Sequence, residues 1–223
     1  MVLEKEAVGR VRVGRACCKT EPVIEVVLRD GSRVEIRALS AADQAGLASG
    51  FERLSERSRY RRFLSPIPQL TPKQLAYFTD VDHHDHEALV AIEPASRDGL
   101  GVARYVRSRD DPDEAEFAVA VADDWQGRGL GTALLRQLAA RAREEGVTWF
   151  TGLVLGENRS MLHMLGTLGD VEQRLGESGT VEVRLHVPED PQHDEHERRL
   201  AGWMRAAATG ELESRLGHAP GGS

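Results

Sequence analysis

The apolar positions of the chain change their period along the sequence, and these changes mark the expected elements. Residues 23–29 are rich in β-branched side chains, residues 34–37 alternate apolar with charged positions, and Asp30-Gly31 between them is a hairpin turn signal. These features predict two antiparallel strands. Strict alternation returns in a last predicted strand, with apolar positions at Val181, Val183, Leu185 and Val187.

Two helical stretches are expected after the first hairpin. Ser40 has the chemistry of an N-cap, and a mostly helical stretch follows to about Phe63. This stretch contains a basic run with interleaved aromatic residues, at Arg57, Arg59, Tyr60, Arg61, Arg62 and Phe63. The run is either a solvated helix face with two core aromatics or a wall that meets phosphate or an acidic substrate. The segment 71–74 is a capping-box variant with proline at the first helical position, so a short helix should run to Phe78.

The middle of the chain predicts a meander. Three β-type runs, at 88–92, 101–106 and 115–122, are joined by loops without helices, which favours antiparallel pairing.

A helix, a strand and a second helix are expected next. The first helix opens in the glycine-rich segment 126–132 and ends at Gly146. Its apolar stripe consists of Leu130, Leu134, Leu135, Leu138 and Ala142. A strand over 147–155 follows. Asn158 then caps a helix whose apolar face holds Met161, Leu162 and Leu165.

The predicted domain spans residues 23–187, between two segments of different composition. Residues 1–22 form an N-terminal extension with one short strand suggested at 9–15. Residues 188–223 comprise an acidic linker, an amphipathic helix and a tail, 218–223, that we expect to be disordered. The apolar face of that helix consists of Leu200, Trp203, Met204 and Ala207. It packs either on its own domain or on a partner subunit, so a homodimer through this helix is one alternative.

Composition argues against several classes of protein. The 223 residues carry a formal net charge of −7, which argues against general nucleic-acid binding. No stretch approaches the roughly 20 apolar residues of a membrane helix, and the first residues lack the layout of a secretory signal. The two cysteines, Cys17 and Cys18, are adjacent and poorly placed for a disulfide. We interpret them as thiols and expect a cytoplasmic protein with no nucleic-acid or membrane partner.

The glycine-rich turn after the meander is the candidate anion site. Gly127, Gly129 and Gly131 alternate around Arg128 at a helix start, where N–H groups and the helix dipole face a ligand. A Walker loop would need a lysine after the last glycine, but Thr132 follows. A dinucleotide fingerprint would need two residues between the second and third glycines, but there is one. A turn that only permits close packing is the remaining alternative.

The run Gln126-Gly127-Arg128-Gly129-Leu130-Gly131 resembles the acyl-CoA motif of the GNAT (GCN5-related N-acetyltransferase) superfamily, and Asn158 matches that family's asparagine. The order of elements agrees from about residue 34 to 187. Three stretches also resemble the bacterial Pat-type protein lysine acetyltransferases, at 55–63, 79–90 and 114–131. The resemblance implies an α/β GNAT fold, in which a mixed, mostly antiparallel twisted sheet is flanked by helices.

The resemblance also implies acetyl-CoA as co-substrate, bound where the strand ending at Val121 diverges from the strand ending near Leu155. The pantetheine arm would pair with the backbone of Val119, Ala120 and Val121, like an added strand. The pyrophosphate would lie on the turn formed by Gln126, Gly127, Arg128, Gly129, Leu130, Gly131 and Thr132. Asn158 would touch the CoA arm or act only as an N-cap.

Transfer to an amine needs a base, because only the neutral amine attacks and a lysine has an ordinary pKa of about 10.4. Glu116 lies on the motif strand where similar Pat-type enzymes place their proposed base, so it is the candidate. It shares a strand face with Ala118 and Ala120, whose small side chains leave room for a substrate. Glu114 lies on the same face and is the second candidate. A surface or salt-bridged role is the alternative for Glu116.

Two positions depart from related families. Many small members place a tyrosine acid seven residues after the asparagine, and that position is Leu165 here. Some members place a base five residues before the asparagine, and that position is Leu153. The histidine-rich segment 82–87 is expected to be a loop, beside the acceptor cleft or purely structural, with no metal. Pat-type enzymes often carry a fused cyclic-nucleotide or amino-acid-binding domain, and we expect none in this sequence.

The expected function is acetyl transfer from acetyl-CoA to a protein lysine, by direct attack in a ternary complex. A small-molecule amine acceptor is one alternative. A non-catalytic acyl-CoA-binding regulatory protein is another. An open, acidic groove would favour a lysine-bearing protein, whereas a closed pocket would favour a small amine.

Overall fold

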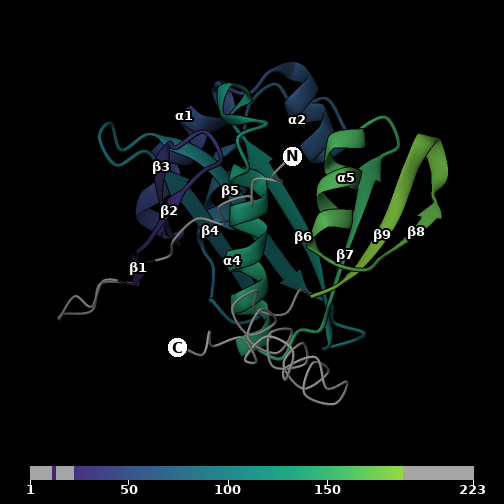
Figure 1. The fold of residues 1–223 in the computed structure, drawn as a ribbon. Helices are drawn as coiled ribbons and strands as arrows, with labels where there is room; N and C mark the ends of the chain where they lie inside the picture. Colours follow the sequence, from purple (N-terminus) through teal and green to yellow (C-terminus); the bar gives the residue numbers. More distant parts are fainter. Residues whose placement is uncertain (1–11, 14–22, 188–223) are drawn as a thin grey trace, which may run out of the picture. The chain divides into compact units, whose positions relative to one another are not determined.

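The structure, a computed structural model, describes residues 12–13 and 23–187 as a mixed sheet flanked by helices (Figure 1). Within this part of the chain, nine strands are paired in the order β1-β2-β3-β4-β5-β6-β7-β9-β8. Neighbours are antiparallel except β6 and β7, which are parallel. The strands are β1 (Arg12–Val13), β2 (Ile24–Val27), β3 (Arg33–Ala38), β4 (His86–Ile92), β5 (Gly99–Arg107), β6 (Glu114–Val121), β7 (Trp149–Leu155), β8 (Val171–Leu175) and β9 (Thr180–His186). The predicted mixed, mostly antiparallel sheet is confirmed.

Helices cover both faces of the sheet. α4 and α5 lie on the near face in Figure 1, where the apolar side of α4 packs against β4, β5 and β6. The β6 residues that point away from α4 face a cavity walled by the first three helices. The helices and turns are η1 (Ala41–Asp43), α1 (Gln44–Glu52), α2 (Glu56–Phe63), α3 (Pro72–Thr79), η2 (Asp123–Trp125), α4 (Leu130–Glu144), α5 (Arg159–Leu168) and η3 (Glu177–Gly179).

The predicted apolar stripe of α4 is confirmed. Its five positions, Leu130, Leu134, Leu135, Leu138 and Ala142, are all buried. Gly101 on β5 permits the close approach, because a Cβ there would lie 2.9 Å from the Ala120 carbonyl oxygen and 3.1 Å from Leu134 Cδ1. The helix therefore packs directly against β5.

The helical stretch expected over 40–63 is divided into α1 and α2. Ser55 has an extended backbone and caps α2 by accepting a hydrogen bond from the Ser58 N–H. Asp123 accepts hydrogen bonds from the Ser55 N–H and Oγ, both at 2.8 Å, and from Ser58 Oγ at 2.7 Å. The break is therefore stabilised by a residue far along the chain, which local sequence patterns do not reveal.

Strand β8 was not predicted. Four of its five residues are exposed, so it lacks the apolar alternation on which strand prediction depends. Of the strand suggested at 9–15, the structure describes Arg12–Val13, which form β1, and the other residues lie outside the described part. Cys17, Cys18, the amphipathic helix, its suggested dimer contact and the tail lie outside the described residues.

The histidine-rich segment 82–87 was expected to be a loop, but its last two residues, His86 and Glu87, begin β4, where they bond to distant arginines. The Glu87 carboxylate is 1% exposed and accepts from Arg141 Nε at 3.1 Å, and it pairs with His83 Nδ1 at 2.8 Å. His86 Nε2 accepts from Arg104, which requires the neutral ring because a guanidinium only donates. In the part of the chain that the structure describes, no cluster of acidic, histidine and cysteine side chains is arranged to hold a metal ion. No helix there is long and apolar enough to cross a membrane.

Lowering the pH from about 7.5 to about 5 should reduce the free energy of unfolding by about 1 kcal/mol through His86. Burial, and then the charge of Arg104, lowers the pKa of His86 from 6.5 to about 4. The unfolded chain thus binds a proton below pH 6.5 that the folded chain binds only near pH 4. The stabilisation is complete above pH 6.5 and is lost as the pH falls toward 4. Partial exposure of the ring makes this figure smaller than the full linkage value.

Urea unfolding of the wild type and of His86→Gln at both pH values tests this contribution. Glutamine keeps an acceptor for Arg104 but does not titrate, so the variant should lose less stability on acidification. An equal loss in the two proteins would contradict the assignment to His86.

Candidate active site

The two parallel strands of the sheet, β6 and β7, separate along their length (Figure 1). Their pairing runs from Glu114 opposite Trp149 to Glu116 opposite Thr151 and continues no further. Beyond that point, residues 119–121 and 152–154 line opposite sides of a groove of about 560 Å³. We call it the β6–β7 groove. Its walls include main chain of β6 that β7 does not pair, which is the condition for an extended ligand to bind as an added strand.

The glycine-rich turn closes one end of this groove. Gly127 has a φ of +76° and Gly129 a φ of +93°, a region that side-chain-bearing residues rarely adopt. The first hydrogen bond of α4 runs from the Ala133 N–H to the Gly129 carbonyl at 3.0 Å. The N–H groups before Ala133 therefore project from the helix end, at the positive end of its dipole. This geometry suits an anion such as a pyrophosphate.

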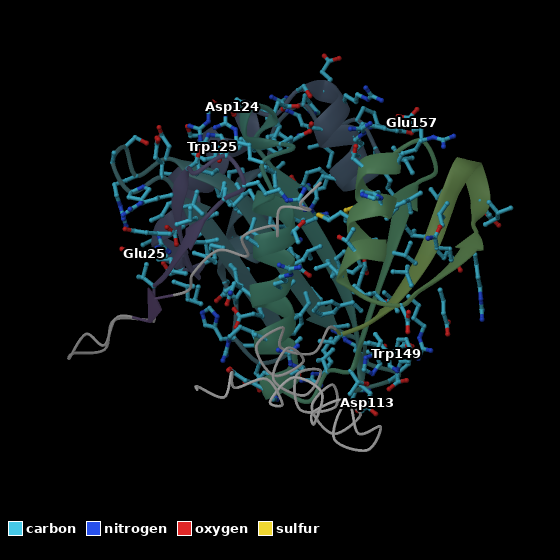
Figure 2. All side chains as sticks on the ribbon, in the orientation of Figure 1. Glu25, Asp113, Asp124, Trp125, Trp149 and Glu157 are labelled. Atoms are coloured by element: carbon cyan, nitrogen blue, oxygen red, sulfur yellow. The ribbon has the colours of Figure 1, made fainter. Side chains whose placement is uncertain are left out.

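Most of the residues predicted to bind the cofactor lie around the same groove. They are Val119, Ala120, Val121, Gln126, Gly127, Gly129, Gly131, Thr132 and Asn158. Asn158 caps α5, since its Oδ1 accepts from the Met161 N–H at 3.4 Å, while its contact with the CoA arm stays a prediction. Figure 2 shows Trp125 and Glu157, beside this turn and this cap, at one end of the sheet, with Trp149 at the other.

Two residues predicted to bind the cofactor, Arg128 and Leu130, do not line the β6–β7 groove. The Arg128 guanidinium pairs with Asp30 at 3.2 Å and stacks over the Trp125 ring at 4.7 Å, so part of its charge is balanced within the protein. The Leu130 side chain is 1% exposed in the core, which leaves only its backbone N–H for a ligand.

Gln126 connects the turn to its surroundings. Its Nε2 donates to the Val121 carbonyl at 3.1 Å and to Ser58 Oγ at 3.2 Å. The Val121 carbonyl is therefore engaged within the protein. The Ala122 N–H bonds the Leu100 carbonyl of β5, so Ala120, two residues before it, also directs its main chain to β5. On β6, the strand-like pairing predicted for residues 119–121 would therefore depend mainly on Val119. Together with Asp123, Gln126 fixes α2 against the glycine-rich turn.

Several groove residues could not be located from the sequence. Arg29 follows β2 and lies beside the turn, where a Cβ on Gly129 would be 3.4 Å from its Cγ. No local signal marks it, because it reaches the groove through a hairpin about a hundred residues away. The basic run at 57–63 was a partial sequence signal for this groove. Arg61 and Arg62 line the groove, whereas Arg59 donates to the carbonyls of Pro68 and Glu52.

Glu116 lies where two depressions meet. It lines the β6–β7 groove and also a second depression of about 550 Å³ on the uncovered face of β6, β7, β9 and β8. We call the second depression the acidic groove, because its charged side chains are four carboxylates and two guanidinium groups. They are Glu114, Glu116, Glu172, Glu182, Arg174 and Arg184.

The neighbours of Glu116 distinguish it from Glu114. Arg184 Nε donates to Glu114 at 2.7 Å, so Glu114 is held in an ion pair. Arg62 lies near enough to Glu116 for their charges to interact. It forms no hydrogen bond or close ion pair with that carboxylate in the described structure. Burial lowers the pKa of Arg62, and the charge of Glu116 partly offsets that effect. Of the two candidate bases, Glu116 is therefore the one whose carboxylate is not held in an ion pair within the described structure.

Comparison with known proteins agrees with this geometry. Residues 53–169 match the model of the acetyltransferase (GNAT) family, and the chain belongs to that family. The acetyltransferase Pat of Mycolicibacterium smegmatis is 34% identical over 165 residues, 74% of this chain and 49% of the relative. The chain thus spans about half the length of that protein. The acetyltransferase PA5475 of Pseudomonas aeruginosa is 34% identical over 149 residues, 66% of this chain and 80% of the relative.

A solved structure shares the fold over most of its length. The GNAT domain of S. lividans PAT aligns with a TM-score of 0.69 and 34% identity, covering 74% of this chain and 96% of that domain. The predicted membership of the GNAT superfamily, with a Pat-like resemblance, is confirmed.

Proposed function

We propose that this protein transfers an acetyl group from acetyl-CoA to the amine of a protein lysine. The observation that carries the proposal is the position of Glu116, at the junction of the β6–β7 groove and the acidic groove. One depression suits an extended anionic cofactor and the other suits a cation. The name of the Pat relatives and the likeness to a PAT GNAT domain support the same assignment.

In the proposed reaction, both substrates are bound before chemistry begins. Glu116 accepts a proton from the lysine ammonium, directly or through water, and the neutral nitrogen attacks the thioester carbon. The C–S bond breaks, the acetyl group forms an amide, and the CoA thiolate takes up a proton. N–H groups near the thioester would stabilise the negative charge on the carbonyl oxygen in the transition state.

The residue that many relatives use to protonate the thiolate is replaced here. Leu165 occupies that position and is fully buried in the core, where it contacts no solvent. We therefore assign the protonation of the thiolate to solvent. The buried leucine instead fixes α5 against the sheet.

The acidic groove favours a protein acceptor over a free small amine. It is broad, uncovered by any described helix and rich in carboxylates, so it can attract a lysine on a folded surface or a basic peptide. Leu153, which is 52% exposed, adds an apolar contact at its edge. A small amine, or a regulatory role without catalysis, remains as an outcome of the test.

Acetylation of lysine peptides, followed by mass spectrometry, tests the acceptor class. The double variant Glu172→Gln/Glu182→Gln should raise KM for a lysine peptide with basic flanks about tenfold, because two attractive charges are removed. It should leave turnover of propylamine and the Kd for acetyl-CoA unchanged. Glu25→Gln, on an exposed β2 position away from the groove, is the matched control.

Equal KM changes for the peptide and propylamine would contradict recognition of a peptide by the acidic groove. Acetylation of propylamine but of no peptide would replace the proposal with a small-amine transferase. Acetyl-CoA binding without turnover of any amine would favour the regulatory alternative.

A further inference from the structure

A cavity separate from the acidic groove lies between the sheet and the first three helices. It has a volume of about 230 Å³ and is walled by side chains of α1, α3, β4 and β5. Most of its lining is apolar, including Leu47, Phe51, Phe78 and Val90. We call it the helical cavity. It meets the β6–β7 groove at Arg62, Phe63 and Ala118, which line both.

Two guanidinium groups face this apolar space with few partners. Arg104 is 6% exposed, donates to His86 and, at a long 3.5 Å, to the Phe78 carbonyl, and stacks 4.7 Å over the Phe78 ring. Arg62 stacks 4.8 Å over the Phe63 ring and makes no hydrogen bond or close ion pair with any residue that the structure describes. Burial lowers the pKa of both groups, that of Arg104 to about 10.

The carboxylate in the cavity wall does not balance these charges. Asp43 is held by a two-pronged ion pair with Arg37, at 2.6 and 2.8 Å. That pair lowers the pKa of Asp43 to about 2. The other carboxylate nearby, Glu35, pairs with Arg97 at 2.5 Å. The charge of Glu116 acts on Arg62 without a hydrogen bond or close ion pair between them. Arg62 and Arg104 therefore retain unused donors, and a buried charge without a hydrogen-bonded counterion is costly.

We propose that the helical cavity binds a small organic carboxylate. The carboxylate would accept hydrogen bonds from Arg62 and Arg104, and its apolar body would lie among the side chains of α1, α3 and β4. The same two charges repel an ammonium, so this ligand is not the amine acceptor of the acidic groove. The inference does not require Glu116 to act as the base, although the charge of Glu116 also acts on Arg62.

Isothermal titration with hexanoate and benzoate tests the charge requirement. Hexanamide and benzamide match these probes in shape but lack the charge. The acids should bind at least about tenfold more tightly than the amides, since hydrogen bonds to charged groups contribute about 1.5–3 kcal/mol. Equal binding of acid and amide, or no binding of either acid, would overturn the proposal.

Variants of the two arginines test the location. Arg104→Met and Arg62→Met should each weaken benzoate binding about tenfold, whereas Arg136→Met, on the exposed face of α4, should not change it. Two arginines on different elements are used because loss of Arg104 alone could unfold the protein, and circular dichroism checks the fold of each variant. Benzoate binding that is unchanged in a folded variant of either arginine would overturn the assignment to this cavity.

Discussion

Replacing Glu116 with glutamine should lower the turnover number for acetyl transfer by about 10²–10⁴-fold, the range typical for loss of a general base. The amide cannot accept the amine proton, while its shape leaves both depressions intact. The Kd for acetyl-CoA should therefore stay within about twofold of the wild type. Steady-state kinetics with a lysine peptide, and isothermal titration with acetyl-CoA, measure the two effects.

Glu114→Gln provides the matched control for this prediction. Glu114 is two residues away on the same strand face, but its carboxylate is paired with Arg184 at 2.7 Å. Its loss should reduce turnover less than the loss of Glu116. Raising the pH should partly restore the turnover number of Glu116→Gln, because a larger fraction of the amine is then neutral without the help of a base. A larger effect at Glu114 than at Glu116 would exchange their proposed roles.

A glutamate at position 129 should raise the Kd for acetyl-CoA at least about 100-fold, which corresponds to about 2.7 kcal/mol. Gly129 has a φ of +93°, so any side chain there is strained, and its Cβ would contact Arg29. The new carboxylate would also place negative charge at the helix end proposed to hold the pyrophosphate. Isothermal titration with acetyl-CoA measures the loss.

Two variants separate charge from backbone strain. Gly129→Ala introduces the strain without the charge and should bind acetyl-CoA more tightly than Gly129→Glu. Gly146→Glu has a comparable φ of +81° at the other end of α4, with no atom within 4 Å of its Cβ, and should bind like the wild type. Failure of the wild type to bind acetyl-CoA would overturn the transferase proposal, because every acceptor depends on that site.

The sequence allowed the centre of the molecule to be predicted because its signals are local there. The stripe from Leu130 to Ala142 has the period of a helix, and the glycines before it mark a turn with unusual backbone angles. The structure agrees with both signals, because the stripe is buried and Gly127 and Gly129 have positive φ angles. The groove between β6 and β7 followed from the family resemblance, because divergence of paired strands has no signal of its own in the sequence.

The remaining features depend on contacts between distant segments. The break before α2 is stabilised by Asp123, about seventy residues later, and Arg29 reaches the groove from a hairpin. The exposed strand β8 has no apolar period to reveal it. The placement of Arg62 and Arg104 in one cavity also requires the packed structure, because no sequence pattern relates the basic run of α2 to an arginine of β5.

The hydrogen bonds between α2 and the glycine-rich turn have a consequence for communication between ligands. Asp123 binds Ser55 and Ser58, and Gln126 binds Ser58, so the helix that carries Arg62 is tied to the turn before α4. A ligand that displaced α2 would therefore alter the glycine-rich turn to which these hydrogen bonds connect it. By thermodynamic reciprocity, a carboxylate in the helical cavity and acetyl-CoA in the β6–β7 groove would then change each other's affinity by the same factor.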